Sequence, residues 1–179
     1  MPGHIAGIAL PYDPERARDL LARAGYPGGR GLPALQALVP AGATVYFEPL
    51  RAQWREVLGA DVVWQAESWT TFEKRMAQDP PHLCGSGWAA DYPDPDSFLR
   101  ASGIQRNTRW RNERYDELVA RAGRTTDQGE RMRLYGQAEQ ILVDEVPIMP
   151  LMYTRKHRLV KPWIQTYPMS WQDVVIEPH

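Results

Sequence analysis

The sequence predicts an α/β fold in which a small mixed or parallel sheet is flanked by helices. Two observations lead to this prediction: strand-like and helix-like stretches alternate over the first half of the chain, and the second half is mainly helical. Strands joined through helices give right-handed crossovers, and the ligands of such sheets lie beyond the carboxyl ends of the strands. A binding site is therefore expected after the third predicted strand.

Three helices are expected in the first half of the chain, over residues 14–24, 47–58 and 68–78. Asp13 can cap the first helix and Ser68 the third, because short oxygen-bearing side chains accept hydrogen bonds from the free N–H groups of a first turn. Apolar residues recur at helical spacing in the first two helices, and a glycine follows each of them, which is a common helix end.

Two further helices are expected in the second half. Asn112 can cap the first of them, which Gly123 closes. Thr125 and Gln128 match a capping box for the second, and Pro147 ends it.

The expected strands have turn residues at their borders. They cover residues 35–39, 61–66, 82–88, 148–153 and 158–161. The remainder of the C-terminal segment, rich in proline and tryptophan, has no clear period.

Composition limits the classes of function. The formal net charge is -1, from 21 basic and 22 acidic residues, so no global field attracts nucleic acid or a membrane surface. Cys84 is the single cysteine, which excludes an intrachain disulfide. The start of the chain does not read as a signal peptide, and no apolar run reaches the length of a membrane span.

The strongest local signal is the segment 87–95, with the sequence GWAADYPDP. It follows the third predicted strand, where a ligand is expected. From these residues alone two interpretations stay open. Asp91 either offers a carboxylate to a ligand beside the Trp88 ring, or it caps the proline-rich turn while Trp88 belongs to the core.

This segment resembles the Gly-Trp-x-x-Asp turn of solute-binding protein family 5, which comprises the oligopeptide, dipeptide and nickel binders of ABC importers. Other stretches resemble motifs of the same family in the same order: 12–26, 54–59, 107–116, 130–139 and 147–163. The resemblance covers nearly the whole chain.

The resemblance implies a two-lobed protein that encloses its ligand, of which this chain corresponds to the C-terminal third. Residues 1–160 are expected to form a periplasmic-binding-protein type II-like C-terminal lobe, and residues 161–179 a tail that returns toward the N-terminal lobe. The implied function is the capture of peptides or other cationic-amine solutes outside the cytoplasmic membrane for the permease subunits of an ABC importer. No enzyme activity, cofactor, nucleic-acid partner or membrane insertion is expected.

Gly87, Trp88, Ala89, Ala90 and Asp91 are the implied ligand-binding residues. In peptide-binding relatives the aspartate is the partner of the ligand's N-terminal ammonium, a charge-assisted contact in a closed cleft. Trp88 would form an aromatic wall, and the backbone of Ala89 and Ala90 would pair with the ligand like an added strand.

One position departs from some oligopeptide binders of the family. These have an arginine three residues before the motif tryptophan, facing the carboxylate of the ligand. Gly85 occupies that position here, so the far end of the ligand is anchored elsewhere or lacks a carboxylate.

Three alternatives remain. The same fold could bind an oligosaccharide stacked on Trp88 and Trp69, or a metal chelate. A hydrolytic enzyme would have to use Asp91 and Asp94, because no Gly-x-Ser-x-Gly, His-Glu-x-x-His or P-loop motif is present. Asp94 and Asp96 are interpreted instead as turn and helix-cap residues.

His82 and Cys84 would share one face of a strand. Two ligands without a third at a recognised spacing are a poor match to a metal site, so none is expected.

Overall fold

A computed structural model describes residues 7–153, 159, 165–167 and 175–177. The chain divides into two compact units, Met1–Met149 and Pro150–His179. The expected boundary between residues 160 and 161 stays a prediction about lobes of a larger protein.

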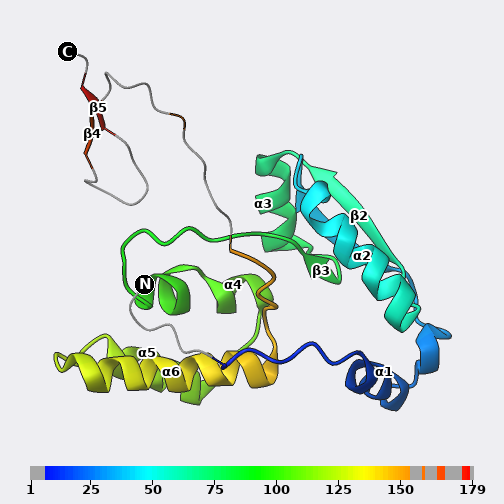
Figure 1. Ribbon diagram of the computed structural model, residues 1–179, viewed down its shortest axis with the longest axis horizontal. Coiled ribbons are helices and arrows are strands. Elements are labelled where there is room, and N and C mark those ends of the chain that lie inside the picture. Colours follow the sequence, from blue (N-terminus) through cyan, green and yellow to red (C-terminus); the bar gives the residue numbers. More distant parts are fainter. Residues whose placement is uncertain (1–6, 154–158, 160–164, 168–174, 178–179) are drawn as a thin grey trace. The chain divides into compact units, whose positions relative to one another are not determined.

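The first unit contains a parallel sheet in the order β2-β1-β3 (Figure 1). β1 (Leu35–Pro40) pairs with β2 (Val62–Glu67) on one side and with β3 (Leu83–Cys84) on the other. Helices α2 (Thr44–Leu58) and α3 (Trp69–Gln78) make the two connections. The α/β class is therefore confirmed, and the described strands of this sheet are parallel rather than mixed.

The central strand is buried on both faces. Leu38 and Val39 point to opposite sides of the sheet and both have no exposed surface. The strand therefore does not alternate between core and solvent, as is typical of a parallel sheet that is covered by helices.

The first helices end within one residue of the predicted positions, whereas α2 begins at Thr44, three residues before its predicted start. The Asp13 carboxylate accepts a hydrogen bond from the backbone of the first turn of α1 (Pro14–Arg23), and the Ser68 hydroxyl does the same for α3. Gly59 ends α2 in the left-handed conformation, with φ 68°. A Cβ there would lie 2.5 Å from the carbonyl oxygen of Gly28, in the short helix η1 (Pro27–Gly29), so only glycine fits.

In the second half of the unit, α5 (Glu113–Ala122) and α6 (Gln128–Glu145) pack side by side (Figure 1). Their facing sides form one buried cluster: Tyr115, Leu118, Val119, Ala122, Leu134, Tyr135, Ala138 and Leu142. Two short elements that the sequence did not reveal, the π-helix η2 (Ser97–Ala101) and α4 (Ile104–Thr108), precede α5. This helical layer supports the segment that follows β3.

The predicted capping box of α6 is wrong. Asp127 is the N-cap, and its carboxylate accepts a hydrogen bond of 2.7 Å from the Glu130 N–H. Thr125 instead donates its hydroxyl to the Arg121 carbonyl at the end of the preceding helix.

Two strand predictions also need correction. Residues 148–153 form no strand, and β3 covers two residues instead of the seven expected over 82–88. The strand expected at 158–161 lies outside the described residues except for Leu159. In the second unit, β4 (Gln165–Tyr167) and β5 (Val175–Glu177) form an antiparallel pair that the sequence did not predict.

None of the described helices is long and apolar enough to cross a lipid bilayer.

Candidate functional site

The segment that follows β3 leaves the carboxyl end of the parallel sheet, as predicted for a site. The Gly85 N–H still donates to the Leu38 carbonyl of β1, at 2.8 Å, and pairing ends there. Residues 87–91, the motif loop, then run without helix or strand toward η2. The loop thus lies at the edge where parallel sheets bind their ligands.

Four of the five predicted site residues are exposed: Gly87, Trp88, Ala89 and Asp91. The Trp88 side chain is 43% exposed, so it is neither buried in the core nor fully accessible to solvent. Ala90 has 1% exposed surface, which leaves no room for a ligand to pair with its backbone in this conformation. The binding role of the loop stays a prediction.

The Asp91 carboxylate forms no hydrogen bond or ion pair with any described residue, since only the backbone N–H of Asp91 has a partner. The cap interpretation of this side chain therefore has no support in the described part of the chain. An exposed carboxylate without a partner, beyond the carboxyl ends of the strands, can bind a cation from solution.

Asp94, three residues later, is in the opposite situation. Its two oxygens accept hydrogen bonds from the two terminal nitrogens of Arg131 on α6, the Oδ1–Nη2 bond being 2.8 Å long. Oδ1 also accepts the Asp96 N–H at 2.9 Å, which is the turn chemistry that the sequence predicted. The Arg131 guanidinium holds the pKa of Asp94 below its usual value.

Asp96 is buried and has three side-chain partners. Its carboxylate accepts hydrogen bonds from the Arg100 guanidinium, from the Tyr92 hydroxyl at 2.6 Å and from the Tyr135 hydroxyl at 3.4 Å. Arg100 is the main cause that lowers the pKa of Asp96, against the opposing effect of burial. The predicted helix-cap role is wrong in detail, because Asp96 takes the N-cap position of η2 without a capping hydrogen bond.

The tyrosines of this network stay neutral. Burial, with the nearby Asp96 charge, raises the pKa of Tyr135 to about 12. The hydrogen bond to Asp96 raises the pKa of Tyr92. Both hydroxyls therefore remain donors at neutral pH.

These contacts remove the basis for a paired-carboxylate enzyme. Both carboxylate oxygens of Asp94 accept hydrogen bonds from Arg131, so Asp94 cannot share a proton or a substrate with Asp91. Asp91 is the acid of this cluster that is left open to solvent.

Two residues that fix this segment were not identified from the sequence: Ser97, which bonds the motif loop, and Arg131, which bonds Asp94. Ser97 is fully buried, and its Oγ accepts hydrogen bonds from the Trp88 indole N–H and the Asp91 backbone N–H. A serine before an apolar run was the available signal, but it cannot reveal a partner nine residues back. Arg131 is 37 positions from its partner Asp94, which no local pattern shows.

Gly85 lies where no side chain fits. A Cβ at this position would meet the Phe47 ring at 2.6 Å and Val39 Cγ1 at 2.9 Å. Phe47, on α2, also packs against Trp64 with ring centroids 5.3 Å apart. This end of the site therefore has an apolar wall instead of a cationic side chain.

Trp69, the other stacking platform considered, is 55% exposed at the start of α3, and its ring stacks on the buried Phe72. His82 is engaged, because its Nδ1 accepts the Gln36 N–H at 2.9 Å. Within the described ranges, no three His, Cys, Asp or Glu residues gather as metal ligands would.

Known proteins resemble this chain along most of its length. The family model described as bacterial extracellular solute-binding proteins, family 5 Middle, matches residues 2–110. Di/tripeptide-binding protein 1 of Pseudomonas aeruginosa is 31% identical over 172 residues, a match that covers 89% of this chain and 32% of that protein. The periplasmic oligopeptide-binding protein OppA of Escherichia coli is 32% identical, with 86% and 29% covered.

Among solved structures, the Escherichia coli murein tripeptide binding protein MppA superposes with a TM-score of 0.77 at 26% identity. The superposition covers 92% of this chain and 35% of that protein. The chain thus spans about a third of the length of these relatives.

Proposed function

We propose a role in solute capture for this chain, which belongs to family 5 of the bacterial extracellular solute-binding proteins. It would form one side of a ligand cleft in a longer, two-lobed protein that serves an ABC importer outside the cytoplasmic membrane. The ligand would be a peptide or another small solute with a cationic amine. The permease subunits of the importer would be its membrane partners.

The observation that supports this proposal best is the exposed Asp91 carboxylate without a described partner, in the same loop as the partly exposed Trp88 side chain. An ammonium group would pair with this carboxylate, and the indole face would attract the same cation. When a second lobe closes over the site and removes water, the attraction strengthens. The same dry site would reject a ligand that leaves the carboxylate unpaired.

The relatives support the same direction. Those reported above are named for di/tripeptides, oligopeptides and a murein tripeptide. All three are binding proteins, so no catalytic step is proposed. Because Phe47 fills the space beside Gly85, the far end of the ligand would be anchored by other parts of the cleft.

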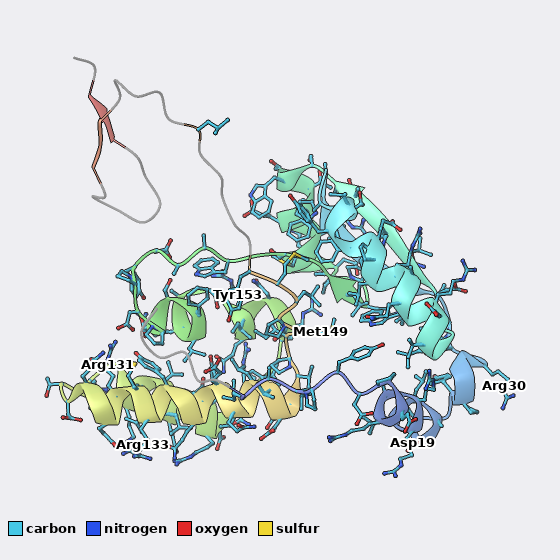
Figure 2. All side chains as sticks on the ribbon, viewed as in Figure 1. Asp19, Arg30, Arg131, Arg133, Met149 and Tyr153 are labelled. Atoms are coloured by element: carbon cyan, nitrogen blue, oxygen red, sulfur yellow. The ribbon has the colours of Figure 1, made fainter. Side chains whose placement is uncertain are left out.

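The test replaces Asp91 by Asn in the two-lobed protein and measures binding of Ala-Ala-Ala and of N-acetyl-Ala-Ala-Ala by calorimetry. Asp91→Asn should weaken the free-amine peptide by about tenfold or more and leave the acetylated peptide little changed. Asp19→Asn is the matched control, because it makes the same charge change on the exposed side of α1 (Figure 2). Equal losses for both peptides would remove Asp91 from the amine-binding role.

The 179-residue chain alone supplies a second test. Half a cleft cannot exclude water from the ion pair, so the isolated chain should bind Ala-Ala-Ala poorly. Micromolar binding by the isolated chain would contradict the shared cleft.

A further inference from the structure

We propose that Ser97 is the positioning residue of the motif loop. Its single hydroxyl holds the two groups on which the proposed site depends, the Trp88 ring and the backbone of Asp91. It thereby fixes the direction from which an ammonium group meets the carboxylate. The role of Ser97 in binding rests on the proposed function, but its hydrogen bonds to the loop can be tested without a ligand.

The hydroxyl of Ser97 is committed to this task. Ser97 has no exposed surface, and a buried hydroxyl without partners is costly. Its oxygen accepts the Trp88 Nε1–H at 3.3 Å and the Asp91 N–H at 3.0 Å. A serine oxygen has two acceptor positions, so both are used within the loop.

The loop needs such a support because it has no regular structure of its own. The loop lies between β3 and η2, and four of its five residues are exposed, so a partly exposed indole on such a segment would sample several rotamers without a hydrogen bond to hold it. Among the described residues, Ser97 is the hydrogen-bond partner of the Trp88 indole. Fixing the ring and the Asp91 backbone before the ligand arrives lowers the entropic cost of binding.

Ser97 is itself held from the helical layer. Its N–H donates to the Asp94 carbonyl at 3.1 Å, at the start of η2. The Asp94 side chain is fixed by two hydrogen bonds from Arg131 on α6. A chain of contacts therefore runs from α6 through Asp94 and Ser97 to the motif loop.

The first test observes Trp88 in the 179-residue chain labelled with 5-fluorotryptophan, by fluorine NMR. Trp88→Phe assigns the resonance by removing it. Ser97→Ala should shift and broaden the Trp88 resonance while the other six stay in place. Ser102→Ala is the matched control, because the Ser102 hydroxyl also bonds within this segment, to the Phe98 carbonyl at 2.5 Å, without touching the loop.

A rescue separates the hydroxyl from packing. Ser97→Thr keeps the oxygen and should return the Trp88 resonance toward its original position. An unchanged Trp88 resonance in Ser97→Ala, or an equal change in Ser102→Ala, would overturn the proposal.

A measurement on the unaltered chain covers the case in which Ser97→Ala does not fold. The Asp91 amide is bonded to Ser97, whereas the Ala89 amide in the same loop has no partner among the described residues. The Asp91 amide should therefore exchange with deuterium about tenfold or more slowly than the Ala89 amide. Equal exchange rates would contradict the proposed hydrogen bond.

Binding in the two-lobed protein then separates this inference from the proposed function. Ser97→Ala should weaken Ala-Ala-Ala by about three- to tenfold, the usual effect of a lost hydrogen bond, and narrow its advantage over the acetylated peptide. If Asp91→Asn weakens the free-amine peptide and Ser97→Ala changes nothing, the positioning role alone fails. If Asp91→Asn changes nothing, the proposed function fails, and the fluorine and exchange results still decide the role of Ser97.

Discussion

Asp91 and Asp96 are five positions apart and differ completely in their surroundings. Asp91 is exposed, and its carboxylate has no partner among the described residues. Asp96 is buried and accepts hydrogen bonds from an arginine and two tyrosines. Asp94, between them, is paired with Arg131.

The difference shows how a protein can keep one acid open in an acidic turn. Three neighbouring carboxylates would repel one another, and a cation could then bind at any of them instead of at one. Here two of the three negative charges are balanced by ion pairs within the chain, Asp96 by Arg100 and Asp94 by Arg131. The negative charge that remains for a ligand is the one on the loop that faces solvent.

The largest expected effect on stability comes from Asp96, the buried acid of this comparison. Asp96→Ala leaves the hydroxyls of the partly buried Tyr92 and the buried Tyr135, and the Arg100 charge, without their acceptor, and should lower the free energy of unfolding by about 3 kcal/mol. Asp91→Ala should change it by less than about 0.5 kcal/mol. Urea denaturation of both variants measures the difference, and similar losses would break the comparison.

The second effect concerns the contact between the turn and α6. Arg131→Met removes a guanidinium that is mostly buried against Asp94 and lies over the Tyr135 ring, and should cost about 2 kcal/mol. Thermal and urea unfolding of the variant give this value.

Arg133→Met is the control on the same helix. Arg131 and Arg133 point to opposite sides of α6, and Arg133 pairs with Glu130 at the surface (Figure 2). Its loss should leave stability unchanged, because exposed ion pairs contribute little. If both variants lose the same stability, Arg131 acts through helix propensity and not through Asp94.

The third effect compares Gly85, which lies just before the motif loop, with Gly87, the first residue of that loop. A Cβ at Gly85 would lie 2.6 Å from the Phe47 ring, whereas nothing stands within 4 Å of one at Gly87. Gly85→Ala should therefore cost about 1.5 kcal/mol through overpacking, and Gly87→Ala almost nothing. Phe47→Leu should recover part of the loss in a double variant, and independent effects of the two changes would contradict the contact.

Most of the fold could be predicted because its signals are local. The capping roles of Asp13, Ser68 and Asn112 are confirmed, since a cap and the N–H groups it accepts lie within one turn. The order of strands and helices predicted the parallel sheet, and the order of motifs predicted the family.

Predictions failed where a residue has two local choices or needs a distant partner. Thr125 and Asp127 can both cap α6, and the carboxylate takes that position while the hydroxyl bonds to Arg121. The apolar residues at 148–153 looked like a strand, but a strand requires a neighbour that sequence spacing does not reveal.

The candidate site shows the same difference between local features, which could be predicted, and distant contacts, which could not. Its place beyond a strand end and the residues of the motif loop were identified from the sequence. Asp94 is neutralised by Arg131, which lies 37 positions further along the chain, and the motif loop is held by the fully buried Ser97. Neither fact has a local signature.

The smallest expected effect is a difference in acid stability. The pKa values of Asp94 and Asp96 are lowered in the folded chain, so below pH 4 the unfolded chain binds more protons than the folded one. Stability that these carboxylates contribute is fully present above the unfolded pKa and is lost as pH falls through the folded values. Asp94→Asn should therefore make the fall of stability below pH 4 shallower than in the unaltered chain, while the slopes above pH 5 agree.

Urea denaturation midpoints between pH 2 and pH 6 test this expectation. A fall of equal steepness in both chains would mean that Asp94 titrates alike in the folded and unfolded states, and that Arg131 does not neutralise it. The turn would then contain two open acids instead of one, and a single amine would have no reason to prefer Asp91. A shallower fall in Asp94→Asn would instead locate the acid-sensitive charge in the closed turn, apart from the carboxylate that the ligand is proposed to meet.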